Sequence, residues 1–499
     1  MREAAAPVGG GLVGEELASR VAGAVRAGAR FAALLPTGRP DGSLCLRAVL
    51  AWPGRYGLEE EVLAPEVGAY QALTPTTPGA TWYERELHDL YGVRPLGHPR
   101  LDPLVLPLAP GTPRPRPGTA ADVGCLDPSE EPLPGHVSGE GLFTIPYGPV
   151  RSGVFEAIQY LVETPGEEIP HLRTRVYHKH RGLSRRFCGL SVGDGVLLAE
   201  RVEGTTSVAQ ASAYCQALEA LAGVEVPPRA GLSRVLHAEL ERVANHLDSM
   251  VRHTEGAGQA VAYARLSLHK ERVLRLQARL CGHRFGRGVV VPGGVSGPPS
   301  LGAAQALAEL ARIDKGATAD IRLLMETPSF LDRLRGTGVL PPEVAGAHGA
   351  VGPIGRASGL AEDLRVARPY GAYPRLGAQA VEPRERGDAL ARQEVRVAEV
   401  ARSFSLARQA LEGLAGAGDG PWRAQFDPPD GTALGWAEAP QGELLYLVEV
   451  EDGRLRAARP RCPAFHNLAL FAQAFRGDIY TDFVFIEASF GLSVAGVAG

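Results

Sequence analysis

The sequence predicts an α+β protein with a small N-terminal α+β domain and a larger, mainly helical domain. Short strand-like stretches occur before residue 104, a segment rich in Pro and Gly spans residues 105–137, and long stretches with helical spacing follow it. With 499 residues and 45% hydrophobic side chains, the chain is long enough for two or three domains. We therefore expect domains at residues 1–104 and 138–499, joined by an extended linker at 105–137.

Two strands and two helices are expected in the N-terminal domain. Residues 30–38 (RFAALLPTG) and 44–52 (LCLRAVLAW) are apolar stretches between Gly and Pro turns, which is typical of strands. An amphipathic helix is expected before them, after a loose N-terminal tail. A second, short helix is expected at residues 81–93 (TWYERELHDLYGV).

Three long helices are expected in the second domain, at residues 232–251, 262–282 and 387–416, because apolar side chains recur there with a helical period. Three such helices in one domain favour an antiparallel bundle. Residues 286–295 (GRGVVVPGGV) are expected to form a strand that ends in a Pro-Gly-Gly turn, and residues 434–462 a hairpin around Glu-Asp-Gly.

The expected helix at 232–251 carries an apolar stripe and a polar flank. The stripe predicts a buried face and contains Leu236, Leu240, Val243, Leu247 and Val251. The flank contains three side chains that we expect to pair with one another as structural groups, namely Glu239, Arg242 and His246. On the helix at 81–93 a docking role rather than chemistry is expected for Trp82, Glu84 and Arg85. His98 is expected to be a turn histidine.

Composition and motifs exclude several classes of function. A net charge of −4 gives no basic field for nucleic-acid binding. The six cysteines are far apart, without a CxxC or a metal-like spacing, so we expect mostly reduced core thiols and no iron–sulfur cluster on this chain. No phosphate-binding loop or dinucleotide fingerprint is present. Neither a secretory signal nor 18 consecutive apolar residues occur, so no membrane span is expected.

Motifs along nearly the whole chain resemble two protein families that are fused in this one chain. Residues 74–107 (TPTTPGATWYERELHDLYGVRPLGHPRLDPLVLP) are similar to the thirty-kilodalton-type subunit of respiratory complex I. From residue 139 (GEGLFTIPYGPV) onward the chain resembles the large subunit of energy-converting nickel-iron hydrogenases and its homologue, the quinone-site subunit of complex I. The motifs are HRG (180–182), ELERVANHL (239–247), GHRFGRGVVVPGGV (282–295), VGPIGRASGL (351–360), RPYGAY (368–373) and EAPQGE (438–443). Such a fusion is typical of the formate-hydrogenlyase type of large subunit and of some bacterial complex I chains.

The resemblance implies a nickel–iron site, and this sequence departs from it. In these hydrogenases two CxxC pairs, at opposite ends of the domain, supply the soft thiolates that hold nickel and iron. The first pair corresponds to Glu203 and Thr206, and the second to Ser493 and Gly496. We therefore expect no nickel and no hydrogenase activity.

The resemblance to complex I also implies a quinone site, in which a Tyr and a His bind the head group. The Tyr corresponds to Gly204, and the His to Arg151 or Ser152. The glutamate that usually follows the HRG motif corresponds to Ser184. Quinone therefore stays a candidate acceptor whose usual protein partners are not found at these positions.

By the same resemblance, the cavity holds an unusually charged set of side chains. These candidate catalytic residues are Arg151, His180, Arg181, Arg201, Glu203, Arg356 and Asp363. In one interpretation Glu203, at a former metal-ligand position, takes up or passes a proton. In the other, these charges pair with one another where a metal once held the fold together. The sequence leaves both interpretations open.

The resemblance implies a peripheral-arm subunit of a membrane-bound oxidoreductase related to complex I and to energy-converting hydrogenases. Such a chain packs on a small iron–sulfur subunit, and both lie on antiporter-like membrane subunits at the cytoplasmic face of the membrane. Electrons from the partner's cluster would reach a quinone-like or unknown acceptor, and a further subunit would be needed for NADH to be the donor. The alternative is a non-catalytic scaffold that couples these partners. A true complex I subunit is less favoured, because residues 282–295 look more like a hydrogenase.

Overall fold

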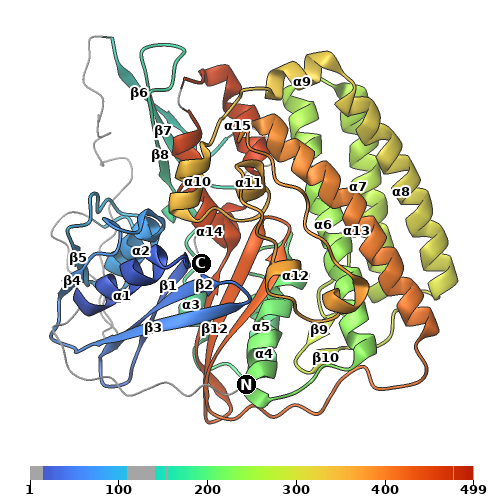
Figure 1. Cartoon of the computed structure of the whole chain (residues 1–499), viewed down its shortest axis with the longest axis horizontal. Coiled ribbons are helices and arrows are strands. Elements are labelled where there is room, and N and C mark those ends of the chain that lie inside the picture. Colours follow the sequence, from blue (N-terminus) through green and yellow to red (C-terminus); the bar gives the residue numbers. More distant parts are fainter. Residues whose placement is uncertain (1–14, 109–140, 152–155, 476, 498–499) are drawn as a thin grey trace. The chain divides into compact units, whose positions relative to one another are not determined.

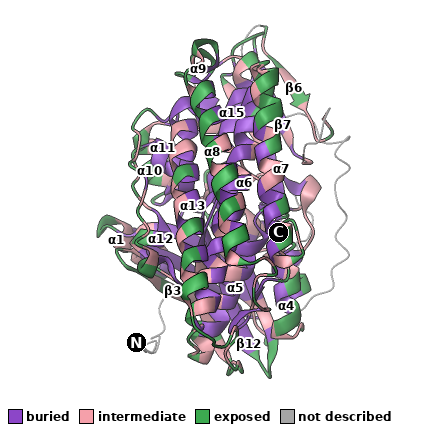
Figure 2. Cartoon of the chain, turned by 90° about the vertical axis from the view of Figure 1, so that its right-hand side faces the viewer, coloured by how far each residue is buried: buried purple, intermediate pink, exposed green. Residues whose placement is uncertain are grey.

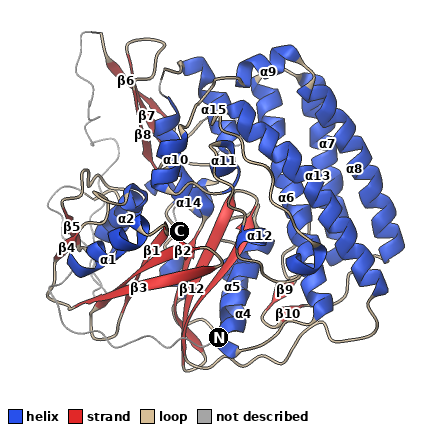
Figure 3. Cartoon of the chain, in the orientation of Figure 1, coloured by secondary structure: helices blue, strands red, loops and turns tan. Residues whose placement is uncertain are grey.

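The computed structural model describes residues 15–108, 141–151, 156–475 and 477–497. The chain divides into two compact units, Met1–Glu131 and Pro132–Gly499. Each unit contains both helices and strands, which confirms the α+β fold class (Figure 3). The predicted N-terminal tail and most of the predicted linker lie outside the described residues.

The N-terminal unit is built on an antiparallel sheet with the strand order β1-β2-β3. β1 (Arg30–Gly38) and β2 (Leu44–Trp52) have the predicted bounds, and β3 (Arg55–Leu63) pairs with β2. The other elements of this unit are α1 (Glu15–Arg26), β4 (Ala69–Gln71), η1 (Pro78–Ala80), α2 (Thr81–Tyr91) and β5 (Arg94–Leu96). α1 is the predicted amphipathic helix, because its Leu17 and Val21 are fully buried.

Polar residues on and after α2 have structural contacts within this unit. The Glu84 carboxylate accepts hydrogen bonds from the Tyr70 hydroxyl (2.9 Å) and from the backbone N–H groups of Leu73 (2.7 Å) and Thr74 (3.0 Å). A buried carboxylate with several donors of this kind stabilises the segment that it binds. His98 Nδ1 accepts from the Arg100 N–H (3.0 Å), which confirms the predicted turn histidine.

Four long helices of the C-terminal unit pack side by side (Figure 1). They are α6 (Pro228–Gly256), α7 (Ala260–Cys281), α8 (Ala303–Met325) and α13 (Ala389–Gly416). Their buried residues face one another and their exposed residues face outward (Figure 2). The five residues of the predicted stripe on α6 are all buried. The sequence analysis missed α8, whose buried face includes two alanines and Asp320 and is therefore a weak apolar signal.

A second antiparallel sheet consists of β11 (Gly431–Ala439), β12 (Gly442–Glu451) and β13 (Arg454–Arg461). It contains the predicted hairpin, which turns at Asp452 and Gly453, together with one further strand. α5 (Ser207–Ala222) packs against β11 and β12. The approach is close: a Cβ at Gly435 would lie 2.1 Å from the Ala213 carbonyl oxygen, so only glycine fits there.

The predicted strand at 286–295 is a short hairpin of β9 (Val290–Val291) and β10 (Gly294–Val295). A third antiparallel sheet contains β6 (Phe143–Tyr147), β7 (Gln159–Thr164) and β8 (His171–Arg175). The remaining helices are η2 (Tyr177–Lys179), α3 (Leu183–Phe187), α4 (Val192–Ala199), α9 (Pro328–Leu334), α10 (Pro342–His348), α11 (Gly352–Ala357), α12 (Leu364–Ala367), η3 (Tyr373–Leu376), α14 (Pro463–Leu468), η4 (Phe471–Phe475), η5 (Tyr480–Asp482), α15 (Phe483–Phe490) and η6 (Val494–Gly496). Across the described ranges, no helix is both long and apolar enough to span a membrane.

Candidate functional site

Glu203 lies in the loop between α4 and α5, and its side chain is buried with 1% of its surface exposed. Its Oε1 atom accepts a hydrogen bond from Gln441 Nε2 at 3.1 Å. Its Oε2 atom has no hydrogen-bond partner of normal geometry among the described residues. A Cβ at Gly496 would lie 3.0 Å from this oxygen, so the C-terminal segment lies directly against Glu203. The two chain regions that the resemblance pairs are therefore neighbours.

Burial makes Glu203 a weak acid. Burial and the nearby Glu156 carboxylate raise its pKa from 4.5 to about 8, whereas the Thr206 hydroxyl and the Arg181 guanidinium act in the opposite direction. The Glu203 carboxyl is therefore protonated at neutral pH and loses its proton in mildly alkaline solution. A buried acid with a pKa of this kind is suited to proton exchange.

Glu156 is a residue of this site that the sequence analysis missed. Its carboxylate accepts from the Ser493 hydroxyl (3.0 Å) and from the backbone N–H groups of Val494 and Ala495, the latter at 3.2 Å. It thereby holds the C-terminal segment next to Glu203. Glu156 and Ser493 are 337 positions apart, so no local motif signals this contact.

Arg181 joins the same two segments. Its Nη2 atom donates to the carbonyl oxygens of Val202 (2.6 Å) and Ala495 (2.7 Å). The neighbouring His180 is neutral, because burial and Arg459 lower its pKa below 6.5. Of the predicted set, the structure thus brings Arg181 and Glu203 together.

Arg201 is not brought to Glu203. Its side chain is 52% exposed and its Nη1 atom donates to the Leu197 carbonyl oxygen of the preceding turn (2.6 Å). It is a surface residue at the end of α4. The candidate set therefore does not share one cavity.

Cys462 also lies beside Glu203. Its Sγ atom accepts from Gln210 Nε2 at 3.2 Å, and burial raises the pKa of this thiol to about 12. A protonated thiol is a poor metal ligand. Within the described parts of the chain, no group of three or more His, Cys, Asp or Glu side chains is arranged to hold a metal ion.

The Arg151 side chain makes contacts with three other side chains of the protein. Its Nη1 atom is 2.8 Å from Glu487 Oε2, on α15, and its guanidinium lies over the rings of Tyr147 and Tyr160 at 5.2 Å and 5.5 Å. The Tyr160 hydroxyl donates to the same Glu487 carboxylate (2.9 Å). Ser152, the other position considered for the quinone-binding His, lies outside the described residues.

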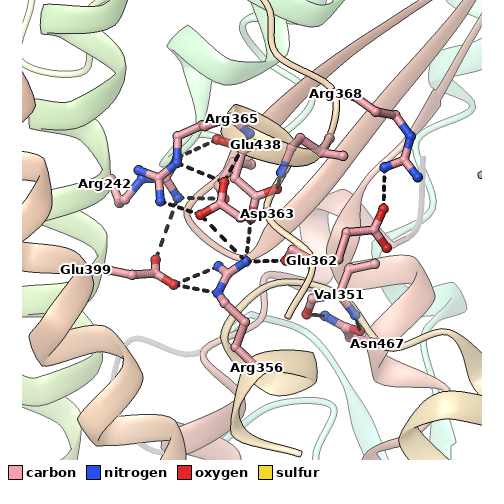
Figure 4. Close-up of polar contacts among 12 residues, drawn as sticks. Arg242, Val351, Arg356, Glu362, Asp363, Arg365, Arg368, Glu399, Glu438 and Asn467 are labelled. Atoms are coloured by element: carbon pink, nitrogen blue, oxygen red, sulfur yellow. Dashed lines mark hydrogen bonds and ion pairs between the residues drawn. The ribbon is translucent and has the colours of Figure 1, made fainter. Parts of the chain in front are cut away.

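Arg356 and Asp363 belong to a buried ion network (Figure 4). Arg356 Nη2 is 2.6 Å from Glu399 on α13, and Nη1 is 3.1 Å from Glu438 on β11. Asp363, which caps α12, pairs with Arg365 at 2.7 Å and lies 4.0 Å from Arg356. The arginine thus joins three elements that are far apart in sequence.

The polar flank of α6 completes this network. Glu239 pairs with Arg242 (3.3 Å), as predicted, and also with Arg365 (3.1 Å). His246 does not pair with them but with Glu399 (2.7 Å). The predicted mutual pairing is therefore confirmed for Glu239 and Arg242 but wrong for His246. Spacing along one helix does not reveal the partners on α12 and α13.

The carboxyl groups of this network have pKa values that are shifted in opposite directions. Burial acts to raise the pKa of Glu399, but Arg356 holds it well below its usual range. Arg365 likewise lowers the pKa of Asp363 to about 2 against the effect of burial. For Glu438, burial and Asp363 prevail and raise the pKa to about 7. Glu438 is thus the carboxyl of this network that exchanges its proton near neutral pH.

A cavity of about 830 Å³ lies between α6, α7 and α15. Its walls combine apolar side chains such as Leu240, Val273 and Val484 with polar ones such as Thr205 and Asn245. Eight charged residues also line it, namely Glu241, Asp248, Arg252, Glu255, Lys270, Glu271, Arg284 and Glu487. A cavity with this mixed lining is suited to a ligand that has both an apolar and a polar part. Glu203 is not part of its lining.

Comparison with known proteins identifies relatives over most of the chain. Residues 257–425 match the model of the respiratory-chain NADH dehydrogenase 49 Kd subunit, and residues 57–113 match that of the 30 Kd subunit. The membrane-bound hydrogenase subunit alpha of Pyrococcus furiosus is 31% identical over 366 residues, which cover 69% of this chain and 84% of that protein. Formate hydrogenlyase subunit 5 of Escherichia coli is 28% identical over 431 residues, or 83% of this chain and 74% of that protein.

A relative that combines the C and D subunits in one chain matches a similar share of this chain. The C/D-type NADH-quinone oxidoreductase protein of Gluconacetobacter diazotrophicus is 28% identical over 471 residues, or 84% of this chain and 78% of that protein. The resemblance drawn from the sequence motifs is confirmed. The chain belongs to the family that unites complex I 49 Kd-type subunits with the large subunits of membrane-bound hydrogenases, and it is an oxidoreductase subunit of this type.

Proposed function

We propose that this chain is the peripheral-arm subunit of a membrane-bound, complex I-like oxidoreductase, in which Glu203 takes up a proton where hydrogenase relatives bind a metal. Electrons come from an iron–sulfur cluster in a small partner subunit and pass to a quinone-like or still unidentified acceptor. The observation that carries the proposal is the buried Glu203 carboxyl, whose Oε2 atom has no hydrogen-bond partner of normal geometry among the described residues and whose pKa burial raises to about 8.

The donor atoms at this site do not fit a nickel–iron group. Nickel and iron of this kind are held by soft thiolates, whereas the four positions carry Glu203, Thr206, Ser493 and Gly496. The nearby Cys462 thiol stays protonated. We expect elemental analysis of the purified protein to find no stoichiometric nickel, and nickel at one atom per chain would overturn this assignment.

The residues of the site define the electron acceptor less closely than they define the absence of a nickel–iron ligand set. Gly204 corresponds to the expected quinone-binding Tyr, and Arg151 or Ser152 to the expected His, so a quinone would have to bind through other groups. The cavity between α6, α7 and α15 is the site that we assign to such an acceptor, because its lining combines apolar and polar side chains and reaches the loop after Glu203 at Thr205.

A non-catalytic scaffold is the second candidate, favoured by the complete pairing of the ion network around Arg356. The two candidates differ in what they require of Glu203 and Arg151. Glu203→Leu combined with Arg151→Met should leave a scaffold functional but should abolish electron transfer through an active site. Arg356 is unsuited to this test, because its loss destabilises the fold in either case.

The partners are tested by mass spectrometry of proteins that co-purify with a tagged chain from detergent-solubilised membranes. We expect a small iron–sulfur subunit and antiporter-like membrane subunits, and a flavoprotein in addition if NADH is the donor. Recovery of the chain alone, from the soluble fraction, would contradict both candidates, since each requires these partners at the cytoplasmic face of the membrane.

A further inference from the structure

The cavity between α6, α7 and α15 ends close to Glu203 without reaching it. Its wall at this end is formed by Thr205 and Asn245, whereas the Glu203 side chain is buried behind them. Gln441, on the turn between β11 and β12, stands between Asn245 and Glu203, because its Nε2 atom hydrogen-bonds to both of them. Gln441 itself is only 7% exposed.

The hydrogen bonds fix the orientation of both amides. Asn245 Nδ2 donates to the carbonyl oxygens of Thr205 (2.8 Å) and Glu241 (2.9 Å), so its Oδ1 atom must face Gln441. Gln441 Nε2 then donates to Asn245 Oδ1 (3.4 Å) and to Glu203 Oε1 (3.1 Å). One amide group thus bridges the cavity wall and the buried carboxyl.

The acceptor side of the Gln441 amide is unused. Its Oε1 atom is buried and has no hydrogen-bond partner within the described part of the chain. An ionised Glu203 needs a donor, which Nε2 provides, but a protonated Glu203 needs an acceptor for its own O–H. Rotation of the amide supplies that acceptor and weakens the bond to Asn245. The bridge is therefore suited to change with the protonation of Glu203.

We propose that Gln441 is a gating and positioning residue whose amide closes the passage between this cavity and Glu203, so that the proton reaches Glu203 from the cavity when the amide rotates. The proton moves from a hydronium ion in the cavity to the Glu203 carboxylate, which leaves a water molecule and a neutral carboxyl. The inference deepens the proposed function, since it rests on Glu203 as the proton acceptor.

Five other titratable groups lie near Glu203, namely Glu156, Arg181, Glu241, Cys462 and Tyr446. Glu241 lines the cavity, and burial raises the pKa of its carboxyl to about 8. Its two oxygens accept from backbone N–H groups at the start of α5, at Val208 (2.7 Å) and Ala209 (3.1 Å). The other four groups are hydrogen-bonded to the C-terminal segment or to Gln210.

The test measures how fast a reagent reaches Glu203 in the full chain within its purified complex. Dicyclohexylcarbodiimide modifies protonated carboxyls in apolar surroundings, and mass spectrometry quantifies the modified Glu203 peptide over time. In Gln441→Ala we expect modification about five- to tenfold faster than in the wild type, because the hydrogen bonds that close the passage are lost. Modification of Glu241, which lines the cavity and whose pKa burial raises to about 8, serves as the internal reference for entry of the reagent into the cavity.

Gln210→Ala is the matched control. Gln210 is also buried and also close to Glu203, but it hydrogen-bonds to Cys462 and Tyr446 on the side away from the cavity. We expect no acceleration in this variant. Equal acceleration in both variants, or none in Gln441→Ala, would overturn the gate and would point to access through the exposed loop at Gly204 and Thr205 instead.

A second variant covers the case in which Gln441→Ala does not assemble. Asn245→Ala removes the partner of Gln441 on the cavity side and should accelerate modification in the same way; an unchanged rate there also overturns the gate. The labelling requires no electron transfer. Failure of the gate is therefore distinguishable from failure of the proposed function, in which Glu203→Gln leaves electron transfer unchanged.

Discussion

Two buried carboxyls near this site, Glu203 and Glu241, have a pKa raised to about 8. For Glu203, burial and Glu156 raise the pKa from 4.5, so between these values the folded chain keeps a proton that the unfolded chain releases. The free energy of unfolding therefore falls as pH rises through this window, by up to about 1.4 kcal/mol per pH unit. The contribution of the Glu203 proton to the free energy of unfolding is fully present below pH 4.5 and is lost above about pH 8.

Glu203→Gln removes this contribution. We expect the variant to gain stability relative to the wild type as pH rises through that window, measured by denaturant unfolding at several pH values. Glu241 and Glu438 are present in both proteins, so their own titration largely cancels in the difference. A difference in unfolding free energy that does not change with pH would contradict the raised pKa of Glu203.

At the residue scale, sequence analysis located part of the site. The resemblance pointed to Glu203 and to the C-terminal segment, and the structure places Gly496 against Glu203. Glu156 and Gln441 could not be found in this way. Their contacts join residues 337 and 238 positions apart, and no local pattern encodes such pairings.

At the element scale, the turn between β11 and β12 is held by a close backbone approach to α11. A Cβ at Gly352, where φ is +63°, would lie 2.1 Å from the Gln441 carbonyl oxygen and 2.6 Å from Gly442 Cα. The backbone at Gly352 and the backbone at Gln441 and Gly442 cannot move apart without displacing Gln441. The two glycines thus position the turn that carries Gln441, directly after the end of β11 that carries Glu438.

Gly352→Ala should lower the free energy of unfolding by more than about 2 kcal/mol, because the new methyl group collides with backbone atoms at a left-handed residue. Gly346→Ala is the matched control, since a Cβ there meets nothing within 4 Å on helix α10. It should change the same quantity by less than about 1 kcal/mol. Similar losses in both variants, by denaturant unfolding, would show that this approach does not constrain the turn.

The ion network links α6, α11, α12, α13 and β11 through buried arginines. Arg356→Met should lower the free energy of unfolding by about 3–5 kcal/mol, because it leaves Glu399 and Glu438 buried beside an apolar side chain. Glu438→Gln should cost less, about 1–3 kcal/mol, since it keeps the shape and one acceptor.

The control for these variants is Arg335→Ala, which removes an exposed pair with Asp332 and should cost no more than about 1 kcal/mol. Denaturant unfolding at neutral pH measures all of them. If Arg356→Met cost no more than Arg335→Ala, the network would not be a source of stability.

The predicted elements are those with a strong local pattern. β1 and β2 are apolar stretches between turns, and α6, α7 and α13 bury clear apolar stripes or end at glycine, so their sequences identify them. α8 was not predicted, because alanines and Asp320 occupy part of its buried face and weaken the apolar pattern. The bundle has four long helices rather than the predicted three for this reason.

The whole chain is related in sequence to hydrogenase and complex I proteins over most of its length. Its buried ion network links several helices and one strand, so we expect that network to stabilise the fold. Glu203 lies outside this network, and its Oε2 atom has no hydrogen-bond partner of normal geometry among the described residues. We take this contrast as support for the proposed electron-transfer subunit over a scaffold.

The most direct test compares electron transfer by membranes that contain either the wild-type chain or Glu203→Gln, with electrons supplied by the donor subunit found through co-purification. We predict normal assembly of the complex but a rate lower by about 100-fold or more, as expected when a general acid–base group is removed. An unchanged rate in a fully assembled complex would contradict the role of Glu203 and would leave the scaffold as the better account.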